Sequence, residues 1–330
     1  MSTTRRRLLL AGILCTSVFA AGAAHAQSGR LVLYTSQPDK DAAQTVAAFR
    51  QVHPGVEVEI FRSGTTEVMS RLAAEFAGGQ PRPDVLLIAD SVSMEALKKE
   101  NRLLAYPEAK VEGFRKESFD ADKTYFGTKL ITTGIAYNTA AKTAPTSWAD
   151  LAKPELKGQI TMPSPLYSGA AAITLGAITQ RPDLGWQFFE DLRRNEAVAV
   201  RGNGAVLKSV ATGEKAYGIL VDFMAFNAKD KGSPIAFVFP KEGATAVTEP
   251  VAILRTASNV PAAKAFVDFL LSPKGQELAV SQGYIPAREG AQNPPWLPAG
   301  TQINLMPMDM EKILSTTEAD KKRFAEMFGG

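Results

Sequence analysis

The chain has 330 residues, with 37 lysines and arginines against 34 aspartates and glutamates, so its net charge is +3. This near balance excludes the strongly basic surface with which a protein binds nucleic acid or an anionic membrane. Cys15 is the single cysteine, which excludes an intramolecular disulfide and any site with two cysteine ligands.

The first 26 residues have the pattern of an export signal. Three arginines at 5–7 precede an apolar run at 8–20, and the sequence A-H-A at 24–26 matches a cleavage site. The apolar run is shorter than the ~20 residues of a membrane-spanning helix. The paired arginines before leucines also match a twin-arginine signal, so both export routes stay open. We expect a periplasmic mature chain that begins near Gln27 and carries no cysteine.

Strands and helices alternate in the first part of that chain. Short β-rich runs predict strands at 30–36, 56–63 and 83–90. Apolar residues at helical spacing predict helices between and after them, at 39–54, 65–79 and 91–104. Strand–helix alternation with short connections indicates βαβ units and a mainly parallel sheet.

The alternation resumes in the second part after a mixed stretch. The patterns first predict a strand pair or bent strand at 129–139, a short helix and loop at 147–159, a strand at 160–164 and a helix capped by Ser168. An amphipathic helix at 182–195, a strand–loop–helix–strand unit at 197–222 and an extended stretch at 235–254 follow. The last predicted elements are two helices in 259–284, an irregular segment at 285–300 and a helix at 317–329. About 300 residues usually form two domains. We therefore predict two α/β lobes joined by more than one crossover.

Catalytic and metal-binding patterns are scarce. The chain has neither a G-x-S-x-G nucleophile turn nor a G-x-x-x-x-G-K-[ST] phosphate loop. His53 is the one histidine beyond the signal, and its place at a helix end indicates a solvated side chain. We expect no catalytic residue, no metal site of histidine or cysteine type and no cofactor. An enzyme that uses only carboxylates, lysine and tyrosine stays open.

Polar residues follow many of the predicted strands. In open α/β sheets, ligands bind beyond the carboxyl ends of the strands. This rule selects candidates in both lobes, although each serine or threonine also suits a helix N-cap. The candidates are Ser36, Gln37, Thr65, Thr66, Asp90 and Ser91 in the first lobe, and Tyr167, Ser168, Gly169, Arg201, Asn203 and Asp222 in the second.

Several stretches resemble the periplasmic solute-binding proteins of ABC importers, in order along the chain. They include "LVLYTSQPDKDAAQTVAAFRQVHPGVEVEI", "GTTEVMSRLAAE", "PDVLLIADSVSMEALKKENRLL", "GIAYNT", "SWADLAKPELKGQI" and "AFVDFLLSPKGQELAVSQGYIPAR". The resemblance implies the type II two-lobe α/β fold, in which each lobe is a mainly parallel sheet flanked by helices and the ligand cleft lies between the lobes. It places lobe 1 at 27–133 plus about 248–300, and lobe 2 at 134–247 plus about 301–330. It also implies a monomer that serves an inner-membrane permease and its ATPase.

The sequence is similar to the branch that holds ferric-ion, thiamine, hexose-phosphate and 2-aminoethylphosphonate binders. Ferric-binding members carry adjacent tyrosines where this chain reads V-D-F-M-A-F at 221–226. The branch holds anions on a Ser-Gly-Ala turn, here Ser168-Gly169-Ala170, assisted by an asparagine at the place of Asn203. A helix N-terminus suits a phosphate there, and Arg201 adds a charge.

The other end of such an anion has two acidic candidates. Asp222 and Glu249 stand where the resemblance implies contacts to sugar hydroxyls, and they would also suit an ammonium group. Val221 replaces the histidine that precedes the aspartate in hexose-phosphate binders. We therefore predict capture of a small phosphorylated or phosphonated solute, of hexose-phosphate or aminoalkylphosphonate type. Ferric iron, with or without a second anion, thiamine, a polyamine and a periplasmic hydrolase stay open as alternatives.

Overall fold

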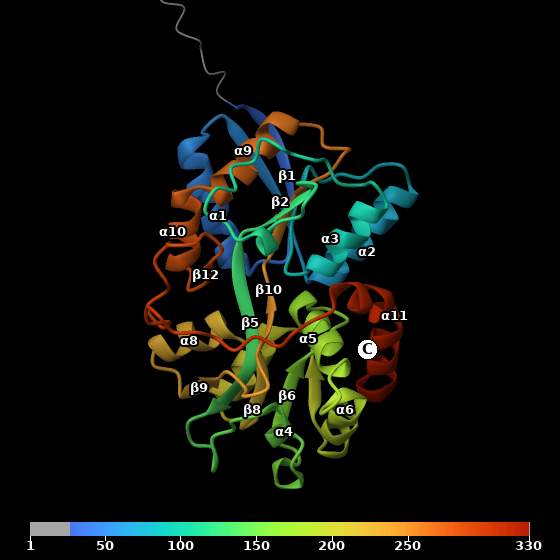
Figure 1. Ribbon diagram of the computed structural model, residues 1–330, viewed down its shortest axis with the longest axis vertical. Helices are drawn as coiled ribbons and strands as arrows, with labels where there is room; N and C mark the ends of the chain where they lie inside the picture. Colours follow the sequence, from blue (N-terminus) through green and yellow to red (C-terminus); the bar gives the residue numbers. More distant parts are fainter. Residues whose placement is uncertain (1–26, 330) are drawn as a thin grey trace, which may run out of the picture.

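The computed structural model describes residues 27–329, so the predicted signal at 1–26 lies outside the described residues. Figure 1 shows two groups of elements, one above the other, with β5 (Lys129–Asn138) running between them. Each group is built on its own β-sheet. Within 27–329, no helix combines the length and the apolar character needed to cross a membrane.

The first sheet has the strand order β2-β1-β3-β11-β4. Strand β1 pairs in parallel with β2 and β3, while β11 pairs antiparallel with β3 and β4. The strands are β1 (Gly29–Thr35), β2 (Val56–Arg62), β3 (Val85–Leu87), β4 (Tyr125–Gly127) and β11 (Pro250–Ile253). The helices of this group are α1 (Asp39–Val52), α2 (Thr65–Ala77), α3 (Ser91–Lys99), α9 (Val260–Leu271) and α10 (Pro273–Ser281).

The second sheet has the order β10-β5-β8-β6-β7, and β9 and β12 also pair with β5. Strand β6 is parallel to β7 and β8, whereas the partners of β5 are all antiparallel to it. Its strands besides β5 are β6 (Ile160–Pro163), β7 (Val198–Val200), β8 (Tyr217–Val221), β9 (Ile235–Val238), β10 (Thr245–Val247) and β12 (Ile285–Pro286). The helices are α4 (Trp148–Leu151), α5 (Gly169–Thr179), α6 (Gly185–Arg194), α7 (Asn203–Ala211), α8 (Asp222–Asp230) and α11 (Met310–Phe328), and short 3₁₀ turns lie at Lys116–Ser118 and Pro154–Leu156.

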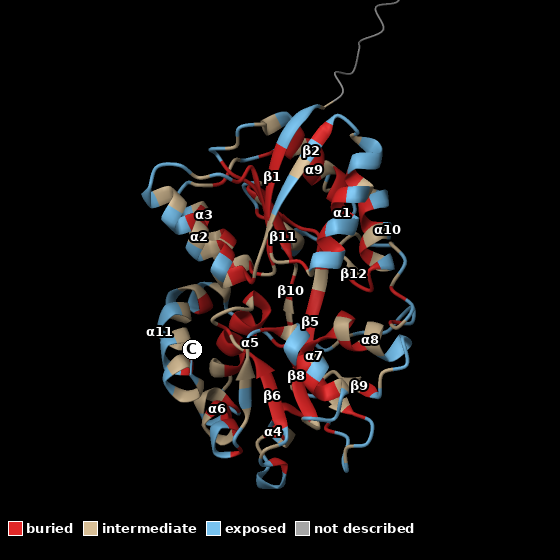
Figure 2. Ribbon diagram, turned by 180° about the vertical axis from the view of Figure 1, so that it is seen from behind, coloured by how far each residue is buried: buried red, intermediate tan, exposed pale blue. Residues whose placement is uncertain are grey.

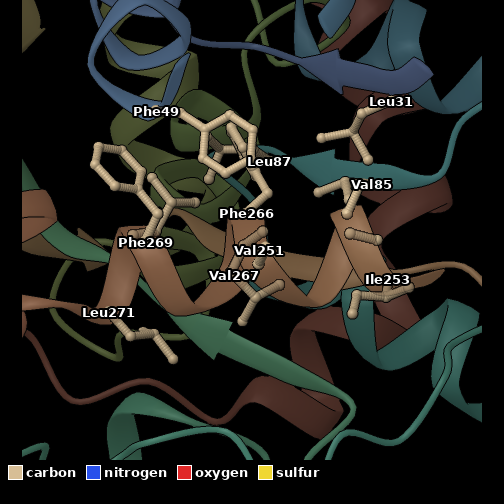
Figure 3. Packing of buried hydrophobic residues seen from close by; sticks show 14 of the residues in the cluster. Leu31, Phe49, Val85, Leu87, Val251, Ile253, Phe266, Val267, Phe269 and Leu271 are labelled. Carbon is tan, nitrogen blue, oxygen red and sulfur yellow. The ribbon is translucent and has the colours of Figure 1, made fainter. Parts of the chain in front are cut away.

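Apolar side chains from distant parts of the chain form the core of the first group. Figure 3 shows Phe49 of α1 against Phe266 and Phe269 of α9, beside aliphatic side chains of the sheet. The rings of Phe49 and Phe266 meet edge to face with centroids 5.0 Å apart. Because α9 follows β11 in the sequence, this contact fastens a late segment of the chain onto the first sheet.

The C-terminal helix α11 contacts both groups. Ile313 of α11, Ile173 of α5 and Val92 of α3 form one buried cluster. Figure 2 shows the central α5 mostly in the colour of buried residues, and ten of its eleven residues are buried. Helix α11 is longer than the predicted 317–329 because the Asp309 side chain caps it by accepting from the Lys312 N–H.

Two crossovers run side by side where the groups join. The backbone N–H groups of Thr128 and Lys129 donate to the Thr248 oxygen at 3.0 and 3.2 Å. Glu249 adopts a φ of 39°, in the left-handed region that costs most residues energy. The two-sheet α/β fold that the sequence predicted is confirmed, with mixed sheets whose parallel pairs lie at β1 and β6. The residue boundaries of the lobes stay a prediction.

Candidate functional site

A cavity of about 440 Å³ lies between the two groups of elements. Its walls come from the strand ends and helix starts of both sheets, as the rule for open α/β sheets predicts. Nine of the predicted site residues line it, namely Ser36, Thr65, Tyr167, Ser168, Gly169, Ala170, Arg201, Asn203 and Glu249. The other five, Gln37, Thr66, Asp90, Ser91 and Asp222, do not.

Five helices, α1, α2, α5, α7 and α8, begin at this cavity, and three of them, α2, α5 and α7, start there with glycine or other small residues. Gly64 and Thr65 start α2, the turn 168–170 starts α5, and the segment 202–205 starts α7. The first N–H groups of a helix lack partners inside the helix, and together they amount to about half a positive charge. Three such ends around one space make it a favourable place for a small anion.

The turn that starts α5 is held by two contacts. Ser168 Oγ accepts from the Ala171 N–H at 3.3 Å, which makes Ser168 the N-cap of α5. Asn203 Nδ2 donates to the same oxygen at 3.2 Å, so the starts of α5 and α7 are tied together. Asn203 Oδ1 is buried and has no partner among residues 27–329. A donor on a ligand or a water would satisfy it.

Arg62 is a cavity residue that the sequence analysis missed. Its Nε donates to the backbone oxygen of Gln37 at 2.7 Å, and its Nη1 donates to the Tyr167 hydroxyl at 3.3 Å. These contacts fix the guanidinium at the cavity wall. The available signal was its place as the last residue of a strand, β2. The rule selects residues that follow a strand, so Arg62, which is itself a strand residue, was not selected.

Arg201 lines the cavity too, but it is much more exposed. Its side chain is 70% exposed, against 28% for Arg62. Its Nη2 contacts both carboxylate oxygens of Glu67, at 2.9 and 3.1 Å, and its guanidinium lies 4.7 Å from the Tyr167 ring centre. Because exposed ion pairs contribute little, Arg62 is the stronger candidate for holding an anion.

Asp222 lies differently from the prediction. Its Oδ2 accepts from the Thr132 N–H at 3.1 Å and from the Thr132 hydroxyl at 2.6 Å, and its Oδ1 accepts from the Phe223 N–H at 2.7 Å. Strand β8 stops pairing with β5 at Val221, and the carboxylate takes the next position along the ladder. The side chain therefore points back to β5, while its neighbours Val221 and Phe223 line the cavity.

Burial raises the pKa of Asp222 to about 7, although its hydrogen bonds oppose the rise. A carboxyl with a raised pKa in the native state binds more protons there than in the unfolded chain between the two pKa values. Its contribution to stability is therefore present at about pH 4 and is lost as the pH rises through about 7.

We expect the stability of the protein relative to an Asp222→Asn variant to fall with pH. Urea unfolding of both proteins at pH 4.5 to 8 measures the difference, because the amide does not titrate. The wild-type free energy of unfolding should fall relative to the variant by up to about 3 kcal/mol across this range, since one pKa unit corresponds to about 1.4 kcal/mol. A pH-independent difference would show that Asp222 titrates normally.

Glu249 lines the cavity but is already paired. Its Oε2 lies 2.7 Å from Lys129 Nζ and accepts from Gln37 Nε2 at 3.3 Å. Both members of the ion pair are almost fully buried, with 4% and 2% of their side chains exposed. Removing either would leave an unpaired buried charge, which is strongly destabilising. Gln37, predicted to touch ligand, instead supports this pair.

Three further predicted residues have local roles. Asp90 accepts from the N–H groups of Val92 and Ser93, so it is the N-cap of α3. Ser91 is the first residue of that helix. Thr66 donates to the Pro165 oxygen at 3.3 Å and contacts the other lobe, not the cavity. Asp90 and Ser91 therefore both belong to the start of α3, and neither lines the cavity.

One wall of the cavity is apolar, which the sequence analysis did not anticipate. Ile131, Val221, Phe223, Met224 and Tyr284 line it. The rings of Phe223 and Tyr284 have centroids 4.1 Å apart, and the Tyr284 hydroxyl donates to Asp41 at 2.7 Å. Helix α8, which begins at Asp222, supplies two of these side chains, and it was not among the predicted elements.

The cavity offers no recognisable metal site. Among residues 27–329, no group of three or more histidine, cysteine, aspartate and glutamate side chains is arranged to hold a metal ion. Burial raises the pKa of Tyr284 well above its usual value, which keeps the phenol neutral. Ferric iron prefers anionic oxygen ligands such as phenolate and carboxylate, so the geometry does not favour it.

The lobes touch across the cavity entrance. The backbone nitrogen of Thr66 lies 3.4 Å from the backbone oxygen of Tyr167, and Arg201 pairs with Glu67. Gly64 is so close to Tyr167 that an added Cβ would lie 2.5 Å from its carbonyl oxygen. These contacts join residues of α2 to the loops of the second sheet. The structure is therefore a closed arrangement of the two lobes.

Known proteins resemble this chain over most of its length. A 28% identical relative from Haemophilus influenzae, an uncharacterized protein, matches over 324 residues, 93% of this chain and 92% of its own. The spermidine/putrescine-binding periplasmic protein of Escherichia coli is 24% identical, over 86% of this chain and 84% of its own.

Solved structures share the fold at low sequence identity. The periplasmic binding protein AfuA from Actinobacillus pleuropneumoniae, with fructose-6-phosphate bound, has a TM-score of 0.82 at 24% identity, over 91% of this chain and 98% of its own. Iron-bound HitA from Pseudomonas aeruginosa has a TM-score of 0.77 at 22% identity, over 89% of this chain and 99% of its own. At these identities the likeness shows the fold and not the ligand.

The family assignment rests on a model match. The model for bacterial extracellular solute-binding proteins matches residues 80–312, which is more than half of the chain. This match confirms the expected resemblance and accounts for a ligand-sized cavity between two lobes. It also identifies the protein as a binding component of transport and not an enzyme. The chain belongs to the bacterial extracellular solute-binding protein family.

Proposed function

We propose that the cavity captures a small phosphorylated or phosphonated organic solute. The observation that carries this proposal is the convergence of three helix N-termini on one cavity beside the fixed guanidinium of Arg62. Oriented N–H groups and arginine favour phosphate oxygens by geometry and by charge. The solved relative with fructose-6-phosphate bound agrees with this choice of ligand class.

The same contacts favour an anion over a cation. A polyamine or thiamine needs free carboxylates, but Glu249 is paired with Lys129, and Asp222 is outside the cavity. Asp39 also lines the cavity. Its Oδ1 lies 3.8 Å from Arg62 Nε, and the Asp39 side chain is 86% exposed. With Glu249 balanced by Lys129, the remaining charged residues of the lining are Arg62, Arg201 and Asp39, and this balance disfavours a cationic ligand.

Transport is the setting of this proposal. The ligand contacts both lobes and stabilises the closed arrangement, which then docks on a membrane permease driven by an ATPase. The family is one of solute-binding components of ABC transporters, so this partner agrees with the match. We further propose that residues 1–26 direct export to the periplasm and that the protein works as a monomer, with lobes divided near residues 133, 248 and 300.

Thermal-shift measurements test the ligand class. A ligand that binds only the native state stabilises it, by about 2.7 kcal/mol at 100 times its dissociation constant. Phosphate esters and phosphonates should raise the melting temperature of the ligand-free protein by several degrees. A rise with ferric citrate, thiamine or spermidine, with none for the phosphorylated compounds, would overturn the proposal.

A further inference from the structure

The apolar wall of the cavity is continuous with the turn that we assign to the anion. Ile131, Ala170, Val221, Phe223 and Tyr284 belong to one buried apolar cluster, against which Met224 packs. All six also line the cavity. Ala170 is in the first turn of α5, so the wall begins next to the N–H groups proposed to hold the anion. A solute whose phosphate sits on that turn places its organic part against these side chains.

The two carboxylates that the sequence predicted to hold a hydroxylated or cationic organic part, Asp222 and Glu249, are engaged within the protein. Asp222 accepts three hydrogen bonds from Thr132 and Phe223. The Oε2 of Glu249 forms an ion pair with Lys129 and accepts a hydrogen bond from Gln37. Sugar hydroxyls or an ammonium placed against the wall would lose their water without gaining Asp222, and Glu249 already has Lys129 as its counter-ion.

The wall is aromatic at its centre. Phe223 and Tyr284 stack in a tilted arrangement, with their planes 35° apart. Met224 follows on the same helix, and a thioether packs favourably at the edge of a ring. Rings prefer offset or edge contacts with other rings, beyond the area that they bury. A flat ring is therefore the organic group that this surface fits best.

We propose that the organic part of the ligand is an apolar aromatic ring that carries the phosphate or phosphonate group. This inference rests on the proposed anion site and names the class of solute that the site takes. It replaces the hexose or aminoalkyl group of the sequence prediction, which relied on Asp222 to line the cavity and on Glu249 to be free of a counter-ion. Burying one aromatic ring in place of a hydrated one increases affinity about tenfold or more.

Titration calorimetry on the refolded, ligand-free full mature chain tests the inference with four probes. Phenyl phosphate carries an aromatic six-membered ring, and glucose 6-phosphate carries a polar six-membered ring. 2-Aminoethylphosphonate carries an ammonium group, and inorganic phosphate has no organic part. Phenyl phosphate should bind at least tenfold more tightly than each of the other three. Its binding should also show a negative heat-capacity change, because apolar surface is buried.

A conservative substitution in the wall separates the ring from the anion. Phe223→Leu keeps an apolar side chain and removes one aromatic surface, so the affinity for phenyl phosphate should fall about fivefold while that for inorganic phosphate stays within twofold. Phe226→Leu is the matched control on the same helix. Phe226 stacks on Trp296, 4.2 Å between centroids, and does not line the cavity. This variant should bind both probes as the wild type does.

The outcomes are distinct. Tighter binding of glucose 6-phosphate or 2-aminoethylphosphonate than of phenyl phosphate would overturn the aromatic inference and leave the anion site intact. An equal loss of both probes in Phe223→Leu would also overturn it, because the side chain would then act on the fold or on the anion. Binding of none of the four probes would overturn the proposed function and this inference with it.

Discussion

Arg62→Met should weaken the binding of a phosphate ester by about 10- to 100-fold. Hydrogen bonds to a charged group contribute about 1.5–3 kcal/mol, and tenfold in affinity corresponds to about 1.4 kcal/mol. Arg62 is held by Gln37 and Tyr167, so little side-chain freedom is lost when it meets a ligand. Calorimetric titration of wild type and variant measures the change.

Two further variants make the result specific. Arg62→Lys keeps the charge without the planar fork and should recover part of the affinity. Arg201→Met removes a guanidinium that is 70% exposed and should change affinity by about threefold or less. If Arg201→Met cost more than Arg62→Met, the anion would lie nearer the entrance of the cavity than we propose.

Gly64→Ala should block closure of the lobes and reduce affinity about tenfold or more. A Cβ at Gly64 would lie 2.5 Å from the Tyr167 oxygen and 2.6 Å from its ring, closer than any ordinary contact. The φ of −62° and ψ of 153° suit alanine, so the backbone itself is not strained. Overpacking of this kind costs about 1–3 kcal/mol, and opening the lobes relieves it.

The readouts for this variant separate closure from folding. The melting temperature without ligand should equal that of the wild type, and small-angle scattering with saturating ligand should give the larger radius of an open protein. Gly78→Ala is the matched control at the other end of α2, since its Cβ would lie 3.5 Å from the nearest atom. Closure and affinity that survive in Gly64→Ala would contradict the closed arrangement as the binding form.

Much of the fold and part of the site follow from the sequence, for a physical reason. Parallel strands bring their carboxyl ends to one edge, so the polar residues after each strand converge whatever their distance in sequence. This geometry selected Ser36, Thr65, Ser168 and Asn203, which come from four different loops and line one cavity. The alternation of β and α patterns along the chain predicted the order of most elements.

The remaining site residues depend on details that a pattern does not carry. Asp222 stands one position beyond the last pair of β8 and β5, where the phase of the strand turns its side chain away from the cavity. Asp90 suits an N-cap and a ligand contact equally well in sequence, and only the backbone turn decides. Tyr284 arrives from the distant end of α10, so its contact with Phe223 is tertiary.

Native mass spectrometry with competing ligands tests the central claim most directly. The ligand-free protein is offered an equimolar mixture of phenyl phosphate, glucose 6-phosphate, 2-aminoethylphosphonate, thiamine, spermidine and ferric citrate. We predict one dominant 1:1 complex whose added mass is that of a phosphorylated or phosphonated compound. A dominant complex with the mass of thiamine, spermidine or iron would contradict the account of the cavity as an anion site.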